Sequence, residues 1–200
     1  KGLVGSEMCI RDSFTSMGAD RIVTMDLHST QIQGFAKIPF DHLYSRMVLM
    51  KAISDLSLDP KRSVVLAPDV GSAAISQAYA KRLKMHFALI DKRRFAPNQA
   101  KVSHLIGELD NMDVLIIDDM IDTAGTTVGA ANAAMEKGAK SVTAIATHGV
   151  LSGPATERLK SAPIKNLVVT DTIQIPEEKI LSNMKIITVA DVFGAAINRI

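Results

Sequence analysis

The stretch Val114-Leu-Ile-Ile-Asp-Asp-Met-Ile-Asp-Thr-Ala-Gly-Thr-Thr127 decides the fold class of this chain. Its first four residues, Val114–Ile117, are apolar and predict a buried strand of a parallel sheet. Two adjacent carboxylates, Asp118 and Asp119, follow where that strand should end. A short loop of small and hydroxylated residues then leads into an Ala-rich helix. Because the first N–H groups of a helix lack intrahelical partners and its dipole favours negative charge, this arrangement predicts an anion site.

Paired carboxylates beside an anion site suit a sugar phosphate. Asp118 and Asp119 would bind ribose hydroxyls or a cation, while the loop would bind the phosphate. The alternative is a plain strand, turn and N-capped helix with solvated acids, which a single Asp-Thr turn would fit equally well. The complete string favours the sugar phosphate.

Short apolar strands, polar residues and helices alternate along the rest of the chain. This alternation predicts an α/β fold with parallel strands joined by crossover helices. Strands are expected at residues 21–27, 63–67, 86–90, 114–117, 141–147, 166–170 and 185–188. Helices are expected at residues 72–83, 127–137, 153–161 and 192–199, with others after Tyr44 and around 99–108.

Polar residues follow four of the predicted strands, namely His28, Asp69, Lys92 and Asp118. Ligands collect at the carboxyl ends of parallel strands, so we expect these residues to form one composite site. Asp69 fits either a ligand of a hard cation such as Mg²⁺ or a cap of the next helix. A lone His28 would more often make a structural hydrogen bond.

The run Lys92-Arg93-Arg94 is a compact cationic block on a predicted loop, because Pro97 and Asn98 interrupt regular structure. Such a block can neutralise the charge of a polyphosphate during group transfer. Alternatively, it is an ordinary solvated cluster of charges.

The amino-acid composition favours a globular protein and disfavours nucleic-acid-binding and membrane-spanning classes. The 200 residues are 47% apolar with mean hydropathy +0.17, which is ample for a packed core. A net charge of +2 and 4% aromatic residues do not indicate nucleic-acid binding. No apolar run approaches the roughly 18 residues that span a bilayer, and the single cysteine, Cys9, rules out an internal disulfide framework. We therefore expect a cytoplasmic protein without membrane or nucleic-acid partners.

The string from Ile117 to Thr126 resembles the phosphoribosyl pyrophosphate motif of the type I phosphoribosyltransferase fold. Its residues are most similar to those of the ribose-phosphate pyrophosphokinase family. The resemblance extends from Phe14 to Ile200 and is carried, in the same order, by residues 24–28 with 31–35, 67–71, 90–94 and 147–154. It implies a type I phosphoribosyltransferase-like parallel sheet flanked by helices, preceded by the tail end of a similar domain.

The resemblance implies transfer of pyrophosphate from MgATP to the anomeric hydroxyl of ribose 5-phosphate, giving phosphoribosyl pyrophosphate and AMP. It assigns catalysis to Lys92 and Arg94 on a mobile flap, and Mg²⁺ binding to His28 and Asp69. Ribose 5-phosphate binding is assigned to Arg94, Asp118, Asp119, Asp122, Thr123, Ala124, Gly125 and Thr126. Family members form dimers and hexamers with shared ATP sites, so a homo-oligomer is implied for the intact protein.

The resemblance also implies a domain boundary near Tyr44–Met50. Residues 14–44 would then end a first phosphoribosyltransferase-like domain, and residues 45–200 would form a second one that binds ribose 5-phosphate. Residues 1–13 match neither, and our hypothesis is that they are foreign to the native sequence. On this interpretation the chain is a fragment, which lacks most ATP-binding elements of the first domain.

Two departures from the family pattern concern the site. Ser72 and Ala73–Ile75 stand where a Gly and then an Arg are usual, which affects contacts to ATP or an effector. Phe95-Ala96 replaces the commoner Pro-Arg after the cationic block.

Two rivals remain. A phosphoribosyltransferase that consumes the pyrophosphate donor and a purine or pyrimidine base is disfavoured by the cationic block and the His28 segment. A non-catalytic regulatory subunit associated with the synthetase is disfavoured because Lys92, Arg94, His28 and Asp69 are all intact.

Overall fold

The computed structural model describes residues 12–35, 38–93 and 102–200. The described chain forms two compact units, one from residues up to Met47 together with Ala190–Ile200, and one from Val48–Val189. The second unit has other bounds than the expected domain at residues 45–200, and the assignment of residues 14–44 and 45–200 to two phosphoribosyltransferase-like domains stays a prediction. Residues 1–11 of the segment expected to be foreign lie outside the described residues, as do Phe95 and Ala96.

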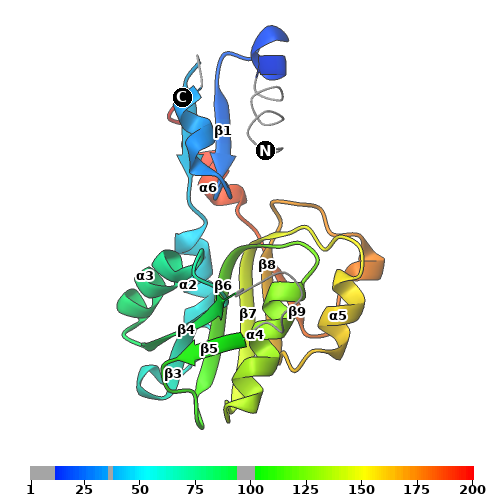
Figure 1. Ribbon diagram of the computed structural model, residues 1–200. Helices are drawn as coiled ribbons and strands as arrows, with labels where there is room; N and C mark the ends of the chain where they lie inside the picture. Colours follow the sequence, from blue (N-terminus) through cyan, green and yellow to red (C-terminus); the bar gives the residue numbers. More distant parts are fainter. Residues whose placement is uncertain (1–11, 36–37, 94–101) are drawn as a thin grey trace. The chain divides into compact units, whose positions relative to one another are not determined.

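The second unit is built on a seven-stranded sheet in the order β5-β4-β3-β6-β7-β8-β9 (Figure 1). All neighbouring pairs are parallel except β4–β5, so an α/β fold with a mostly parallel sheet and flanking helices is confirmed. The strands are β3 (Ser63–Ala67), β4 (His86–Arg93), β5 (Val102–Ile106), β6 (Asp113–Ile121), β7 (Ser141–Gly149), β8 (Asn166–Thr170) and β9 (Met184–Ile187).

Two helices cover each face of this sheet (Figure 1). On one face lie α2 (Arg46–Ser54) and α3 (Ala73–Leu83), and on the other α4 (Gly125–Glu136) and α5 (Ala155–Ser161). Short 3-10 helices, η2 (Pro60–Arg62) and η3 (Glu177–Lys179), lie in the connections.

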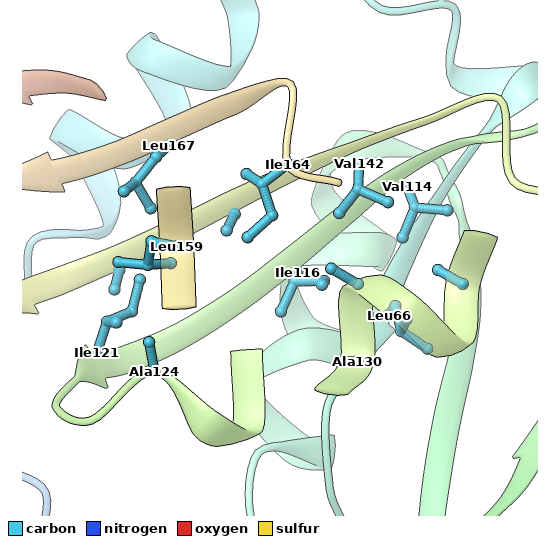
Figure 2. Packing of buried hydrophobic residues seen from close by; sticks show 14 of the residues in the cluster. Leu66, Val114, Ile116, Ile121, Ala124, Ala130, Val142, Leu159, Ile164 and Leu167 are labelled. Carbon is cyan, nitrogen blue, oxygen red and sulfur yellow. The ribbon is translucent and has the colours of Figure 1, made fainter. Parts of the chain in front are cut away.

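Side chains alternate between the two faces because successive residues of a strand point in opposite directions. In β6, Val114 and Ile116 pack with α4 and α5, whereas Leu115 and Ile117 pack with α2 and α3. Figure 2 shows part of the first cluster, with Ile116 near Ala130 of α4. The continuous apolar run of the strand is therefore explained by burial on both faces.

The edge strand β5 corrects one prediction. A helix was expected around residues 99–108, but Val102–Ile106 pairs antiparallel with β4, with Lys92 opposite Ser103. Leu105 packs against the core while its neighbours His104 and Ile106 are exposed, which is the two-residue period of an edge strand. An antiparallel edge strand on an otherwise parallel sheet is a common arrangement.

Other element boundaries agree or shift by a few residues. The strands predicted at 63–67 and 166–170 match β3 and β8, and a helix after Tyr44 is confirmed as α2. Both β4 and β6 run farther than predicted, and α4 starts two residues earlier, at Gly125. The extensions at the carboxyl ends of β4 and β6 and the earlier start of α4 fall at the polar residues of the candidate site.

The first unit contains a two-stranded parallel sheet of β1 (Ile22–Met25) and β2 (Phe40–Leu43), with Ile22 opposite Phe40 and Met25 opposite Leu43. It also contains the 3-10 helix η1 (Thr30–Phe35) and the helix α6 (Ala190–Ile197). Strand β2 was not predicted. Within the described ranges, no helix has the length and apolar character needed to cross a membrane.

Candidate functional site

The candidate site lies at the carboxyl ends of β3 and β6. Pairing between these parallel strands stops at Leu66 opposite Ile116, whereas β6 stays paired with β7 as far as Ile121. The last part of β6 therefore extends past its pairing with β3. Asp118 and Asp119 lie within this extension, so the prediction that the strand ends before them was wrong. The parallel arrangement still brings them to the same edge of the sheet as Asp69.

Asp118 is half-buried among other acids. Burial raises the pKa of Asp118 to about 7, and the negative charges of Asp119 and Asp69 add to the rise. The Asp119 N–H opposes it by donating a hydrogen bond to Asp118 Oδ1 at 3.0 Å. The electrostatic effect of Asp69 shows that these acids share one environment. Their mutual repulsion favours a cation or hydroxyl donors at this edge of the sheet.

Asp69 also organises the start of α3. Its Oδ1 accepts hydrogen bonds from Ser72 N at 3.0 Å and Ser72 Oγ at 3.2 Å. A Cβ on Gly71 would lie 3.2 Å from the same oxygen, so glycine leaves room for the carboxylate. Asp69 is not the N-cap of α3, because Ser72 occupies that position without a side-chain capping bond. Asp69 instead holds Ser72 in the turn that precedes the helix.

The residues between β6 and the first turn of α4, Asp122–Thr126, form what we call the 122–126 segment. Ala124 has φ +60°, a left-handed conformation that is costly for alanine. Its side chain is only 4% exposed and packs in the core near Ile121 and Leu159 (Figure 2). The other four members of the segment are exposed. The buried methyl thus anchors a strained turn whose remaining residues face solvent.

The 122–126 segment presents the N-terminus of α4. The first hydrogen bond of the helix runs from Val128 N to Ala124 O at 2.9 Å. The N–H groups of Gly125, Thr126 and Thr127 therefore have no acceptor within the helix. Since Gly125 and Thr126 are exposed, this end of α4 can receive an anion, as predicted.

Three hydrogen bonds to this segment come from two residues to which the sequence analysis assigned no role. Ser152 N donates to Asp122 O at 3.0 Å, and Ser152 Oγ donates to the Asp122 carboxylate. Arg158 Nη1 donates to Thr123 O at 3.0 Å. Ser152 lies in the stretch 147–154 that carries the family resemblance, but the local pattern does not reveal either contact. Ser152 and Arg158 act on residues 30 and 35 positions away in the chain.

The cationic block differs from its prediction. Lys92 was expected on a loop, but it belongs to β4, which β5 extends by antiparallel pairing as far as Arg93. Arg94 lies outside the described residues. The backbone position of Lys92 is three residues past the last β4 residue paired with β3, Leu89, and so toward the carboxyl edge.

His28 belongs to the first unit and is exposed after the end of β1. Its neighbour Leu27 is held by His42, an unpredicted residue whose Nε2 accepts a hydrogen bond from Leu27 N at 3.0 Å. The opposite ring nitrogen, Nδ1, lies 2.9 Å from the Gln33 side chain. His42 therefore fixes the backbone that carries His28. His28 stands in a different unit from Asp69 and Asp118.

Oxygen donors at the sheet edge fit a hard divalent cation. Asp69, Asp118 and Asp119 supply carboxylates, and Mg²⁺ needs only one or two of these besides water and phosphate oxygens. Among the described residues, no three His, Cys, Asp or Glu side chains are grouped so that they could hold a metal ion by themselves. The chemistry therefore suits a cation shared with a phosphate ligand rather than a cage made only of protein.

The opposite edge of the sheet carries a hollow of about 370 Å³. Arg62, Lys140 and Lys165 line it together with Asp113. Burial raises the pKa of Asp113, but the Ser141 hydrogen bond and the Lys140 and Lys165 charges outweigh burial and lower it overall. The charge of Asp113 is thus already balanced by protein groups.

The chain belongs to the phosphoribosyl synthetase-associated domain family, which matches residues 94–200. It is 48% identical over 191 residues to a ribose-phosphate pyrophosphokinase of Caldanaerobacter subterraneus, covering 96% of this chain and 60% of that protein. It is 46% identical over 192 residues to the ribose-phosphate pyrophosphokinase of Clostridium tetani, covering 96% and 60%.

Among solved structures, phosphoribosylpyrophosphate synthetase from Mycobacterium smegmatis shares the fold with a TM-score of 0.88 at 36% identity. That similarity covers 96% of this chain and 62% of the other. The chain thus spans about 60% of the length of the relatives that it matches.

Proposed function

We propose that the full-length protein is a ribose-phosphate diphosphokinase, and that the Val48–Val189 unit binds ribose 5-phosphate. The observation that carries this proposal is the exposed 122–126 segment at the N-terminus of α4, directly after the paired acids Asp118 and Asp119. Family membership and the names of the relatives support the same assignment.

In this proposal the 5-phosphate of the sugar accepts hydrogen bonds from the N–H groups at the start of α4. Thr123 and Thr126 add hydroxyl donors, and Gly125 lets the phosphate approach the backbone closely. Asp118 and Asp119 accept hydrogen bonds from the ribose hydroxyls. Phosphate and hydroxyl contacts together fix the sugar at both ends, which is how positioning lowers the barrier to group transfer.

The reaction joins the anomeric oxygen of ribose 5-phosphate to the β-phosphorus of ATP. The bond between that phosphorus and the oxygen bridging to the α-phosphate breaks, AMP leaves, and the hydroxyl proton passes to solvent. We assign Lys92 and Arg94 to stabilising the charge that develops on the transferred group.

The oxygen donors at the sheet edge fit Mg²⁺, which we propose is held with ATP by Asp69 and His28. When bound, this ion would neutralise phosphate charge. The hydrogen bonds from Ser72 use Oδ1 of Asp69, and they fix the direction of its carboxylate. We further propose a homo-oligomeric cytoplasmic enzyme, with residues 14–44 ending a first phosphoribosyltransferase-like domain.

The activity is tested by measuring AMP formation from ATP and ribose 5-phosphate with the full-length protein in isolation. The proposal expects AMP and phosphoribosyl pyrophosphate in equal amounts. Pyrophosphate release that depends on an added purine or pyrimidine would instead identify a phosphoribosyltransferase. No turnover in isolation, with restraint of an active synthetase on mixing, would identify a regulatory subunit.

The role of Lys92 is tested in the same assay. Lys92→Ala should lower turnover far more than it weakens ribose 5-phosphate binding, because the charge is needed on the transferred group. Lys51→Ala, which removes an exposed lysine of α2, is a matched control that should keep parental turnover. Equal turnover in Lys92→Ala and the parent would remove Lys92 from the catalytic machinery.

A further inference from the structure

The 122–126 segment is held from one side by the chain that follows β7. Ser152 makes two hydrogen bonds to Asp122, one from its backbone N–H and one from its hydroxyl. Leu151 N also donates to Ile121 O at 3.0 Å. Arg158, on the outward side of α5, donates to Thr123 O at 3.0 Å. The start of the anion site is therefore tied down at three successive residues.

The bond from Arg158 determines the direction of a backbone N–H. In a planar trans peptide the carbonyl and the following N–H point to opposite sides. Because the Thr123 carbonyl points to Arg158, the Ala124 N–H points away from it. A carbonyl turned toward the opening would repel an anion. The same bond also helps to maintain the left-handed conformation of Ala124, which persists only when its surroundings hold it.

Arg158 also brings charge to the start of α4. Its Nη1 lies 3.4 Å from the position that a Cβ would occupy on Gly125. The guanidinium therefore lies beside the first residue of the helix, where its positive charge adds to that of the helix dipole. Arginine has five N–H donors, and the contact with Thr123 uses one of them.

We propose that Arg158 is a positioning residue for the phosphate end of the substrate. It fixes the peptide between Thr123 and Ala124 and strengthens the positive potential at the start of α4. Ser152 acts with it by fixing Asp122. The identity of the ligand rests on the proposed function, whereas the bracing of the 122–126 segment does not.

Two measurements on the full-length protein test this inference. The first is the hydrogen-exchange rate, without ligand, of the amides of Leu151, Ser152 and Val128, which donate hydrogen bonds to Ile121, Asp122 and Ala124. It is measured in the parent, Arg158→Ala, Arg158→Lys and Ser152→Ala. The second is the KM for ribose 5-phosphate and for ATP in the same proteins. Lys160→Ala is the matched control, because Lys160 is an exposed cation on the same helix without a side-chain bond to the described residues.

We expect faster exchange in Arg158→Ala and Ser152→Ala, and parental exchange in Lys160→Ala. The KM for ribose 5-phosphate should rise about 10-fold in Arg158→Ala, with little change in kcat or in the KM for ATP. Arg158→Lys should recover part of this loss because it keeps the charge but not the planar fork of donors.

Exchange and kinetics that match Lys160→Ala would overturn the inference. So would an equal rise of both KM values with unchanged exchange. If the parent fails to bind ribose 5-phosphate, the phosphate role fails together with the proposed function, and the exchange rates alone then decide whether the brace exists.

Discussion

Asp113 is the first residue of β6, whereas Asp118 lies in the carboxyl-terminal half of the same strand, past its pairing with β3, and their environments differ sharply. Asp113 is 15% exposed and receives hydrogen bonds from Ser141 at 2.6 Å and Lys140 at 3.2 Å, and its pKa is lowered. Asp118 is half-buried beside Asp119 and Asp69, and its pKa is raised to about 7. Asp113 is stabilised by a hydroxyl and by lysine charges, whereas Asp118 accepts one backbone hydrogen bond from Asp119 and faces the negative charges of two other acids.

We interpret this difference as marking the carboxyl ends of the strands as the ligand-binding side of the sheet. A structural acid is stabilised by neighbouring donors, as Asp113 is. An acid held near like charges costs stability, and such arrangements are common at functional sites. We therefore attribute the repulsion at Asp118 to the binding of ribose hydroxyls and a cation, which would relieve it.

The largest effect is expected from exchanging the two acids for amides in turn. Asp118→Asn should raise the KM for ribose 5-phosphate or lower kcat/KM by about 10- to 100-fold, because hydrogen bonds to a charged acceptor are lost. Asp113→Asn should change kcat/KM by less than about threefold, since it lies at the other edge. Equal losses of kcat/KM in steady-state assays of the two variants would contradict the distinction between Asp118 as a ligand-binding acid and Asp113 as a structural one.

At neutral pH, Asp118→Asn and Asp113→Asn should change the free energy of unfolding in opposite directions. The pKa of about 7 for Asp118 lies above its ordinary value of 3.8. The folded protein therefore binds more protons than the unfolded chain between these values, and stability from this group falls as pH rises from about 4 to 7. Asp118→Asn should raise the free energy of unfolding at pH 8 by about 1 to 3 kcal/mol, allowing for partial exposure.

Urea denaturation of the parent and of Asp118→Asn at pH 4, 6 and 8 measures this change in the free energy of unfolding. The gain from Asp118→Asn should shrink toward pH 4. A variant that is less stable than the parent at pH 8 would show that the carboxylate is favourably placed without ligand.

A smaller effect is expected on ligand binding. If the ionised Asp118 accepts ribose hydroxyls, affinity should rise a few-fold as pH rises from 6 to 8. The substrate phosphate titrates near pH 6, so the same calorimetric titration with Asp118→Asn corrects for it. Parallel pH profiles in the parent and the variant would contradict the assignment of hydroxyl binding to Asp118.

The smallest effect concerns the opposite end of β6. Ser141→Ala should raise the pKa of Asp113 and lower the free energy of unfolding by about 1 kcal/mol at pH 7. Because the lowered pKa stabilises the fold only above its ordinary value of 3.8, the loss should fade as pH falls through that value. Carbon NMR titration of the carboxyl groups follows both acids together, and an unchanged pKa of Asp113 would contradict the role of Ser141.

The sequence predicted the regular core well because its signals are local. Residues 63–67 form one continuous apolar strand as expected, and the 122–126 segment lies exposed at the start of a helix. Asp118 and Asp119 look like a strand end by polarity, yet backbone pairing with β7 carries β6 past them. The polarity of a stretch indicates whether its side chains are buried. Whether its backbone continues a strand depends on a neighbouring strand, here β7, which the local sequence does not reveal.

The residues that brace the site could not be predicted for a similar reason. Arg158 contacts Thr123 across 35 positions, and nothing around it distinguishes it from the exposed Lys160 two residues later. The left-handed turn falls on Ala124, although local rules favour glycine for such a conformation. Tertiary burial of the alanine methyl overrides that preference. The role of His28 in binding a metal remains a prediction.

The most direct test is a crystal structure of the full-length protein with ribose 5-phosphate bound. The phosphate is expected on the N–H groups at the start of α4, with the sugar hydroxyls on Asp118 and Asp119. A phosphate bound instead in the hollow beside Arg62 and Lys165 would contradict the account. So would a sugar turned away from both acids.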